Sequence, residues 1–214
     1  RWAFDSADWP GFAGQGNHNL TIGDIDNDGK DEVVYGSMCV DDDGTGLYTT
    51  QLGHGDAAHM SDMDPTRPGL EIWMVHESNL AGSTFRDART GEVIFDHYNA
   101  GDVGRCAGAH LDADYPGYQF WSVARGGTYT VDNVKISDHQ SGMGNFLIYW
   151  TGDLQREILD CGNHYWPVIN KWWGDGAGRL LSLYMVPEPY STHTITPPVQ
   201  ETHGSPAPAE DHEG

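Results

Sequence analysis

The chain has 214 residues, of which 32 are acidic and 11 are basic, so its formal net charge at pH 7 is −21. This balance argues against nucleic acids and anionic membranes as partners, because both bind basic surfaces. Hydrophobic residues make up 38% of the chain, and 28 glycines with 11 prolines indicate many turns. The length suits one large β-domain or two small ones, and the sequence contains no apolar run of membrane-spanning length.

An acidic run at 24–32 leads directly into the apolar stretch EVVYG at 32–36. Carboxylates at alternate positions of a tight turn point to one side, and a glycine gives the turn its backbone angle. Because so many negative charges repel one another without a cation, the run predicts a calcium site. The alternative is an acidic turn that binds nothing. The expected ligands are Asp24, Asp26, Asp28, the carbonyl of Lys30, and Glu32.

Two weaker copies of this run follow, at 61–75 and 110–123. Each places acidic side chains before a Pro-Gly turn and an apolar strand, although His110 stands in the third copy where the second has Asp62. The copies start about 40–50 residues apart, which is the spacing of β-propeller blades or similar β-repeats. The candidate calcium ligands in these copies are Asp62, Asp64, Glu71, Asp112 and Asp114.

Short apolar segments separated by turn clusters continue along the chain from residue 20. No convincing helical periodicity extends beyond about ten residues, so the pattern predicts an all-β protein. The predicted strands are 20–23, 32–40, 46–51, 70–76, 83–88, 92–98, 118–124, 128–136, 145–151, 156–160, 166–172 and 179–186.

The composition changes at Pro187, where the chain becomes rich in Pro, Thr, His and acidic residues. Composition alone predicts a disordered linker for 187–214. We expect this tail to become ordered by lying on a partner, such as a neighbouring subunit. The predicted organisation is therefore a β-domain at 1–186 followed by a Pro-rich tail.

Cysteine usage and the first residue bear on the cellular compartment. Three cysteines, Cys39, Cys106 and Cys161, are too few for a disulfide scaffold, so one pair with a spare thiol and three free thiols both stay open. The sequence begins with Arg1 and shows no signal peptide, and we expect a processed or excised chain. Because exposed carboxylate loops bind calcium best where it is plentiful, an extracellular location is expected.

A further pattern comes from stretches taken in chain order. They are GQGNHNLTIGDIDNDGKDEVVYGSM at 14–38, DDDGTGLYTTQLGHGDAAHMSDMDPTRPGLEIWMVHE at 41–77, FRDARTGEVIF at 85–95, GDVGR at 101–105, YPG at 115–117 and WTGDLQREILD at 150–160. These stretches resemble the propeller-type rhamnogalacturonan lyases, and the similarity runs through almost all of 12–181. The resemblance implies an extracellular eight-bladed β-propeller with several calcium ions, of which this chain would form three to four blades. It also implies cleavage of the rhamnose–galacturonate backbone of pectin by β-elimination.

Polar loops within the resemblance supply the candidate substrate-binding residues. Loops of this kind at blade entrances line a substrate or calcium pocket, or form a hydrogen-bond network beneath it. An arginine in GDVGR could hold a uronate carboxylate in a forked contact, or pair with an aspartate of the chain itself. The candidates are Asn17, His18, Asn19, His54, Asp56 and Arg105.

The sequence also departs from the family. The NNGTK and GDWREE segments, which the resemblance associates with substrate binding and catalysis, do not occur here, so no catalytic residue is predicted. The first functional hypothesis is a non-catalytic, calcium-binding structural module that self-assembles through blade faces and the tail, as a homo-oligomer or filament. The second is a fragment of an active lyase, and the third is a pectin-binding module without chemistry.

Overall fold

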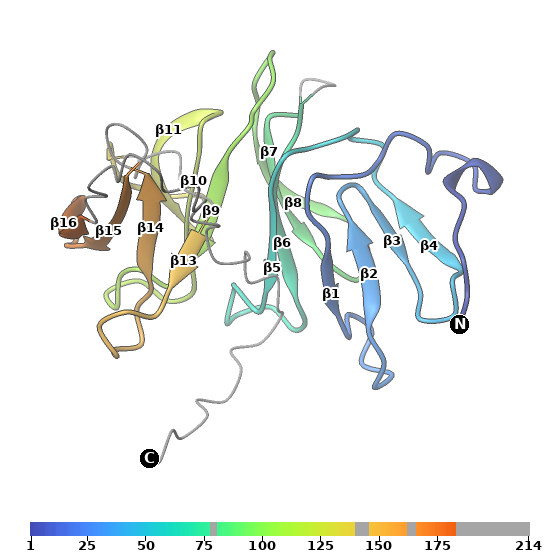
Figure 1. Ribbon diagram of the computed structural model, residues 1–214, viewed down its shortest axis with the longest axis horizontal. Coiled ribbons are helices and arrows are strands. Elements are labelled where there is room, and N and C mark those ends of the chain that lie inside the picture. The colour runs from blue at the N-terminus through green and yellow to red at the C-terminus, as the bar shows by residue number, and fades with distance from the viewer. Residues whose placement is uncertain (78–80, 140–145, 162–165, 183–214) are drawn as a thin grey trace, which may run out of the picture.

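The computed structural model describes residues 1–77, 81–139, 146–161 and 166–182. These residues form four antiparallel four-stranded sheets, each a simple meander of consecutive strands, and the sheets follow one another side by side (Figure 1). The tail at 187–214, with its expected ordering by a partner, lies outside the described residues. The all-β fold built from consecutive propeller-type blades is confirmed.

The strands are short, as expected for propeller blades. The first sheet contains β1 (Thr21–Gly23), β2 (Glu32–Tyr35), β3 (Met38–Val40) and β4 (Gly46–Thr49), and the second contains β5 (Ala58–Ser61), β6 (Glu71–Val75), β7 (Ser83–Asp87) and β8 (Val93–His97). The third contains β9 (Cys106–Ala109), β10 (Gln119–Ser122), β11 (Arg125–Thr130) and β12 (Lys135–Ser137), and the fourth contains β13 (Phe146–Ile148), β14 (Glu157–Cys161), β15 (Pro167–Trp172) and β16 (Ala177–Ser182). One 3-10 turn, η1 (Ser6–Asp8), precedes them.

Two predicted strands were wrong in their extent. The segment 32–40 is a hairpin, because Gly36 adopts φ 67° and its missing Cβ lets the Gly16 carbonyl approach. Similarly, 128–136 divides into parts of β11 and β12, which pair around the turn that contains Asn133, at φ 60°. The apolar pattern continues through these tight turns, so it does not show where the chain reverses direction.

Two strands, β5 and β9, were not predicted. Every residue of both strands is buried, so neither shows the alternation that marks a half-exposed strand. Their sequences, AHMS and CAGA, are also short and rich in small residues. They are the first strands of the second and third sheets, and they contact each other.

Apolar side chains fill the spaces between adjacent sheets. Trp73 and Phe120 are fully buried between the second and third sheets, with ring centroids 5.3 Å apart. Similar clusters join the first sheet to the second and the third to the fourth. Full burial of one large apolar side chain stabilises a fold by about 1.5–3 kcal/mol, so these clusters hold the sheets together. The described residues contain no helix long and apolar enough to cross a membrane.

Polar contacts also cross each of the three boundaries between sheets. The Tyr48 hydroxyl donates to the Ala88 carbonyl at 2.6 Å, and the Trp73 indole donates to the Trp121 carbonyl at 3.2 Å. The Trp172 indole donates to Oδ2 of Asp112 at 2.8 Å. Each contact satisfies a polar atom that would otherwise be costly to bury.

The three cysteines are unpaired. Cys39 and Cys106 are buried and Cys161 is exposed, so no disulfide joins these residues. Burial raises the pKa of the Cys39 thiol to about 12, which makes it an inert core residue.

One structural feature repeats in all four sheets, at the first residue of the second strand or at its equivalent. A buried side chain there accepts hydrogen bonds from backbone amides of the turn that precedes it. In the third sheet, one side-chain oxygen accepts from the amides of Leu111 and Asp112, both at 2.8 Å. This contact closes the turn onto the sheet. The four acceptors are Glu32, Glu71, Gln119 and Glu157.

Substitution of Gln119 tests whether the buried acceptor stabilises the turn of the third sheet. We expect Gln119→Met to lower the free energy of unfolding by about 2–5 kcal/mol, because two buried amides lose their partner. Gln119→Glu keeps an acceptor oxygen and serves as the matched variant, with a smaller loss. Urea denaturation of the three proteins measures the difference, and equal midpoints for Gln119→Met and the wild type would contradict the interpretation.

A second test concerns a buried histidine. Nε2 of His59 lies 3.0 Å from the Cys106 carbonyl, between the second and third sheets, and burial lowers the pKa of this imidazole to about 4. Its pKa in the unfolded chain is about 6.5. The folded state therefore binds fewer protons, and stability falls as the pH drops from 6.5 toward 4.

We expect the loss from His59 to approach about 1.4 kcal/mol per pH unit in this window. Denaturation at a series of pH values measures the slope in the wild type and in His59→Gln, whose amide can donate to the same carbonyl. Other titrating groups are common to both proteins and cancel. The variant should lose stability less steeply, and identical slopes would refute the assignment.

Candidate functional site

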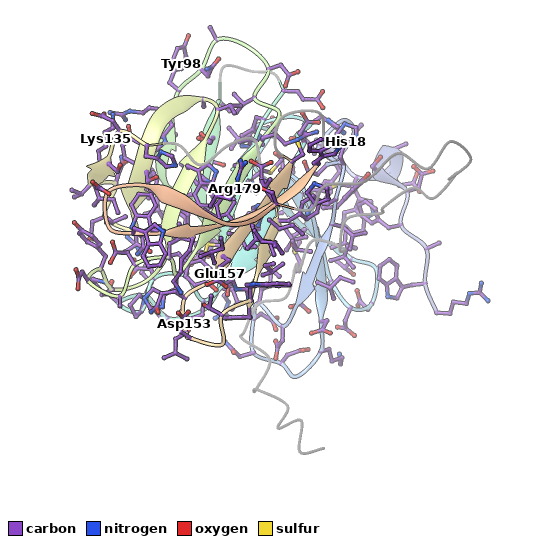
Figure 2. All side chains as sticks on the ribbon, turned by 60° about the vertical axis from the view of Figure 1, so that its left-hand side comes forward. His18, Tyr98, Lys135, Asp153, Glu157 and Arg179 are labelled. Atoms are coloured by element: carbon purple, nitrogen blue, oxygen red, sulfur yellow. The ribbon has the colours of Figure 1, made fainter. Side chains whose placement is uncertain are left out.

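Ionisable side chains gather at two opposite ends of the sheets. The turns that join the first and second strand of each sheet lie at the lower end of Figure 1, and they contain the acidic runs. Asp153 and Glu157 mark this end in Figure 2, whereas His18 lies toward the other end. We refer to the two groups as the acidic end and the histidine cluster, the latter comprising His18, His54, Asp56 and Glu77.

The turn of the first sheet is shaped by its own carboxylates. Asp24 accepts from the amides of Asp28 at 3.1 Å and Gly29 at 3.0 Å, so the turn wraps around this side chain. Asn27 and Gly29 have φ values of 66° and 90°, a left-handed conformation that suits asparagine and glycine. The short spacing of the run is therefore enough to fold it into a closed turn.

A group of carboxylates meets inside this turn. Asp24, Asp26 and Glu32 offer oxygens that lie within 4.8 Å of one another, and Glu32 forms a second such group with Asp41 and Asp42. Glu32 is fully buried, and its Oε1 has no hydrogen-bond partner. Burial, followed by the charges of nearby aspartates, raises its pKa against the opposing hydrogen bond from the backbone.

The chemistry of this donor set fits a hard divalent cation. Calcium prefers several carboxylate oxygens, and a buried carboxylate oxygen without a partner is costly unless a cation neutralises it. The residues that would hold an ion are Asp24, Asp26 and Glu32 in one group, and Glu32, Asp41 and Asp42 in the other. Asp41 was not predicted as a ligand, although its place in the acidic triplet at 41–43 is a signal that could have indicated it.

Two other predicted ligands of this turn have different contacts. Asp28 is exposed, and its Oδ1 accepts from the Lys30 amide at 2.9 Å. The Lys30 ammonium lies 2.9 Å from Asp42 and 3.5 Å from Asp28, so its charge already offsets part of the acidic turn. Both residues stand at the solvent side of the group.

The second turn contains a basic side chain. Glu71 accepts from the amides of Met63 and Asp64, and burial raises its pKa to about 7. Asp64 accepts from Thr66 at 2.7 Å and lies 3.3 Å from Nε of Arg67, while Asp62 is exposed.

In the third turn, Asp112 accepts from the Trp172 indole and from the Asp114 amide. Asp62, Asp64, Glu71, Asp112 and Asp114 join no three-donor group among the described residues.

The histidine cluster draws its members from loops of two sheets. Nε2 of His18 lies 3.1 Å from Asp56 and 3.3 Å from Glu77, and Nδ1 of His54 lies 3.0 Å from Glu77. The two imidazole rings meet edge to face, with centroids 4.9 Å apart. His18, His54 and Glu77 offer ligand atoms within 4.8 Å of one another, so this group can also hold a cation.

Backbone contacts bring these loops together. The His18 amide donates to the Gly55 carbonyl at 3.1 Å, and the Glu77 amide donates to the His54 carbonyl at 3.0 Å. Asn17 forms an isolated parallel bridge with Gly55, which aligns the loop before β1 with the loop before β5. The cluster is therefore assembled by the packing of the first two sheets.

The two carboxylates of the cluster influence each other. Burial, and then the hydrogen bond and charge of Glu77, raise the pKa of Asp56. Partial burial would also raise the pKa of Glu77, but hydrogen bonds with Asp56 and His54 lower it overall. The pKa values of the two carboxyl groups are thus shifted in opposite directions, and Glu77 faces both imidazoles.

The predicted substrate-binding residues separate into two groups. His18, His54 and Asp56 lie in the cluster, and Nη1 of Arg105 is 3.9 Å from Asp56. The side chain of Asn19 instead pairs with the backbone of Ala58 and with Asn17, which is a supporting role beneath the loops.

Glu77 was not predicted as a site residue. It follows β6 by two residues within the stretch MVHE, but nothing in its local spacing relates it to His18 or His54.

Comparisons with known proteins relate this chain to a protein family. The sequence profile of the "Rhamnogalacturonan lyase family 11, C-terminal domain" matches residues 1–196. The chain is 47% identical over 190 residues to "Rhamnogalacturonan exolyase YesX" and 50% identical over 175 residues to "Rhamnogalacturonan endolyase YesW", both of Bacillus subtilis (strain 168). These matches cover 80% of this chain and, respectively, 30% and 27% of the relatives.

The solved structures agree with this result. The crystal structure of the exotype rhamnogalacturonan lyase YesX matches with a TM-score of 0.78 at 43% identity, covering 86% of this chain and 33% of that one. The chain thus spans about three tenths of the length of the curated relatives it matches. From its profile, its relatives and its four consecutive blades, we conclude that this chain belongs to rhamnogalacturonan lyase family 11, in whose C-terminal domain it lies.

Proposed function

We propose that this chain is the cation-binding propeller segment of a rhamnogalacturonan lyase. The observation that carries the proposal is the carboxylate group around Glu32, whose buried Oε1 has no protein partner. A calcium ion would supply the missing positive charge and join the first turn to the end of β3. The curated relatives are a rhamnogalacturonan exolyase and an endolyase, which favours the same class of acidic polysaccharide for this chain.

The histidine cluster suits recognition of a uronate. His18 and His54 can donate hydrogen bonds, Arg105 carries a fixed positive charge, and Glu77 can hold a cation together with the imidazoles. A cation bound there would attract the galacturonate carboxylate and stabilise the charge that develops when the C5 proton is removed. His18, His54 and Arg105 would orient the galacturonate beside the cation.

The proposed role of the chain by itself is binding. Elimination needs a base at C5, and the NNGTK and GDWREE segments that the family resemblance associates with catalysis do not occur in this sequence. In this proposal, cleavage depends on groups that this sequence does not contain. An extracellular location accords with the proposal because calcium is plentiful there.

Calcium binding is tested with matched variants of the acidic end. We expect calcium to raise the melting temperature of the wild type. At a free calcium concentration of a hundred times the Kd, the free energy of unfolding should increase by about 2.7 kcal/mol. Glu32→Gln should weaken binding at the first turn tenfold or more, whereas Asp31→Asn, an equal charge change at an exposed neighbour, should leave it unchanged. Scanning calorimetry with calcium and with a chelator measures this, and equal calcium responses in all three proteins would reject the site.

Uronate recognition is tested with a rhamnogalacturonan oligosaccharide in isothermal titration calorimetry, in the presence of calcium. We expect Glu77→Gln to weaken binding about tenfold, a loss of about 1.4 kcal/mol. Glu92→Gln, at an exposed position outside the cluster, is the control and should bind as the wild type does. No binding by the wild type would reject the proposal, and release of unsaturated uronate by this chain alone would contradict a purely binding role.

A further inference from the structure

The turn at the acidic end of the fourth sheet contains a positive charge from the chain itself. Nζ of Lys171, on β15, donates to Oγ1 of Thr151 at 2.9 Å, to Oε1 of Glu157 at 3.1 Å and to Oδ2 of Asp153. The Lys171 side chain is only 15% exposed, and Glu157 is fully buried. Asp153 and Glu157 lie together at this end of the sheet in Figure 2. Three oxygens therefore surround one ammonium group.

Two oxygen-bearing residues of this turn stand at positions that aspartates occupy in the first turn, although Tyr149 stands where the first turn has Asp24. Thr151 and Asp153 precede the buried Glu157 by six and four residues. In the first sheet, Asp26 and Asp28 precede the buried Glu32 by the same intervals, and the two glutamates are equivalent acceptors of the turn amides.

The ammonium also stands at the position of a first-sheet carboxylate. Val33 pairs with Val40, which places Glu32 opposite Asp41 across β2 and β3. Ile158 pairs with Asn170, which places Glu157 opposite Lys171 across β14 and β15. The residue opposite the buried glutamate is thus an aspartate in the first sheet and a lysine in the fourth.

The pKa values of the two buried glutamates differ in direction. Burial would raise the pKa of Glu157, but hydrogen bonds from Thr151, the Trp150 amide and Lys171 outweigh it and lower this pKa. The pKa of Lys171 is raised, first by its hydrogen bond to Asp153. Glu32, by contrast, has a raised pKa and an oxygen without a partner. In the fourth turn an ammonium group of the chain thus contacts the buried glutamate, whereas in the first turn Oε1 of the buried glutamate has no partner.

We propose that the Lys171 ammonium takes the place of a divalent cation in the fourth sheet, and that the turn at 151–157 is a latent cation site that opens when this lysine is removed. Three oxygens converge on Nζ, and two of them belong to carboxylates, which calcium takes as ligands. The wild-type fourth sheet keeps its turn closed at any calcium concentration. The inference takes its donor pattern from the proposed calcium site of the first sheet, on which it otherwise does not depend.

The test gives the fourth turn a carboxylate at the position that Asp41 occupies in the first sheet. Lys171→Asp supplies a carboxylate opposite Glu157, and we expect titration with terbium or calcium to reveal one more bound ion per chain than in the wild type. Without the ion, Lys171→Asp should melt at a lower temperature than the wild type, and calcium should restore its melting temperature. Lys135→Asp has the same charge change at an exposed lysine of β12 and should add no site. A folded Lys171→Asp protein with unchanged stoichiometry would overturn the proposal.

Two further variants keep the test decisive. If Lys171→Asp does not fold in either condition, Lys171→Met removes the ammonium without adding charge. A larger calcium-induced rise in melting temperature than in the wild type then supports the latent site, and an equal rise overturns it. The same titrations in a Glu32→Gln background remove the first-sheet site. The extra ion of Lys171→Asp should persist there, so failure of the first-sheet site and failure of this proposal give different results.

Discussion

Each of the four sheets depends on one buried acceptor that ties the turn after its first strand to the start of its second. The acceptor is a glutamate in three sheets and a glutamine in the third. Unpaired backbone amides are costly to bury, so this side chain sets the position of the turn relative to the sheet. A glutamate in this place also brings a buried negative charge, and the rest of the acidic end compensates that charge.

The four turns accommodate the buried acceptor and the charge around it in different ways. In the first, Glu32 lies near four aspartates, and its Oε1 has no protein partner and is free for a cation. The second turn places the Arg67 guanidinium beside Asp64, and the third replaces the glutamate with the neutral Gln119. The fourth uses the Lys171 ammonium. The same backbone arrangement therefore accommodates different sets of charged side chains, because the amide hydrogen bonds that shape the turn need only an acceptor oxygen.

The histidine cluster depends on a different constraint, the packing between sheets. Its members come from the loop before β1, the loop before β5 and the residues after β6, and backbone hydrogen bonds align these segments. The bond from the His18 amide to Gly55 crosses between the first two sheets, and the cluster that contains Ile72 and Met74 fills the space between these sheets. Packing between these two sheets therefore brings His18 to His54 and Glu77, which both belong to loops of the second sheet.

The sequence by itself determined the repeat, the all-β class and the acidic turn at 24–32, because these rest on local spacing and on alternation within a few residues. It did not reveal β5 and β9, whose complete burial removes the alternating pattern. Only the tertiary structure decided that Glu77 joins the histidines and that Asp41 and Lys171 stand opposite equivalent glutamates. Cross-strand register and packing between sheets bring these groups together, and both depend on contacts between segments that are distant in the chain.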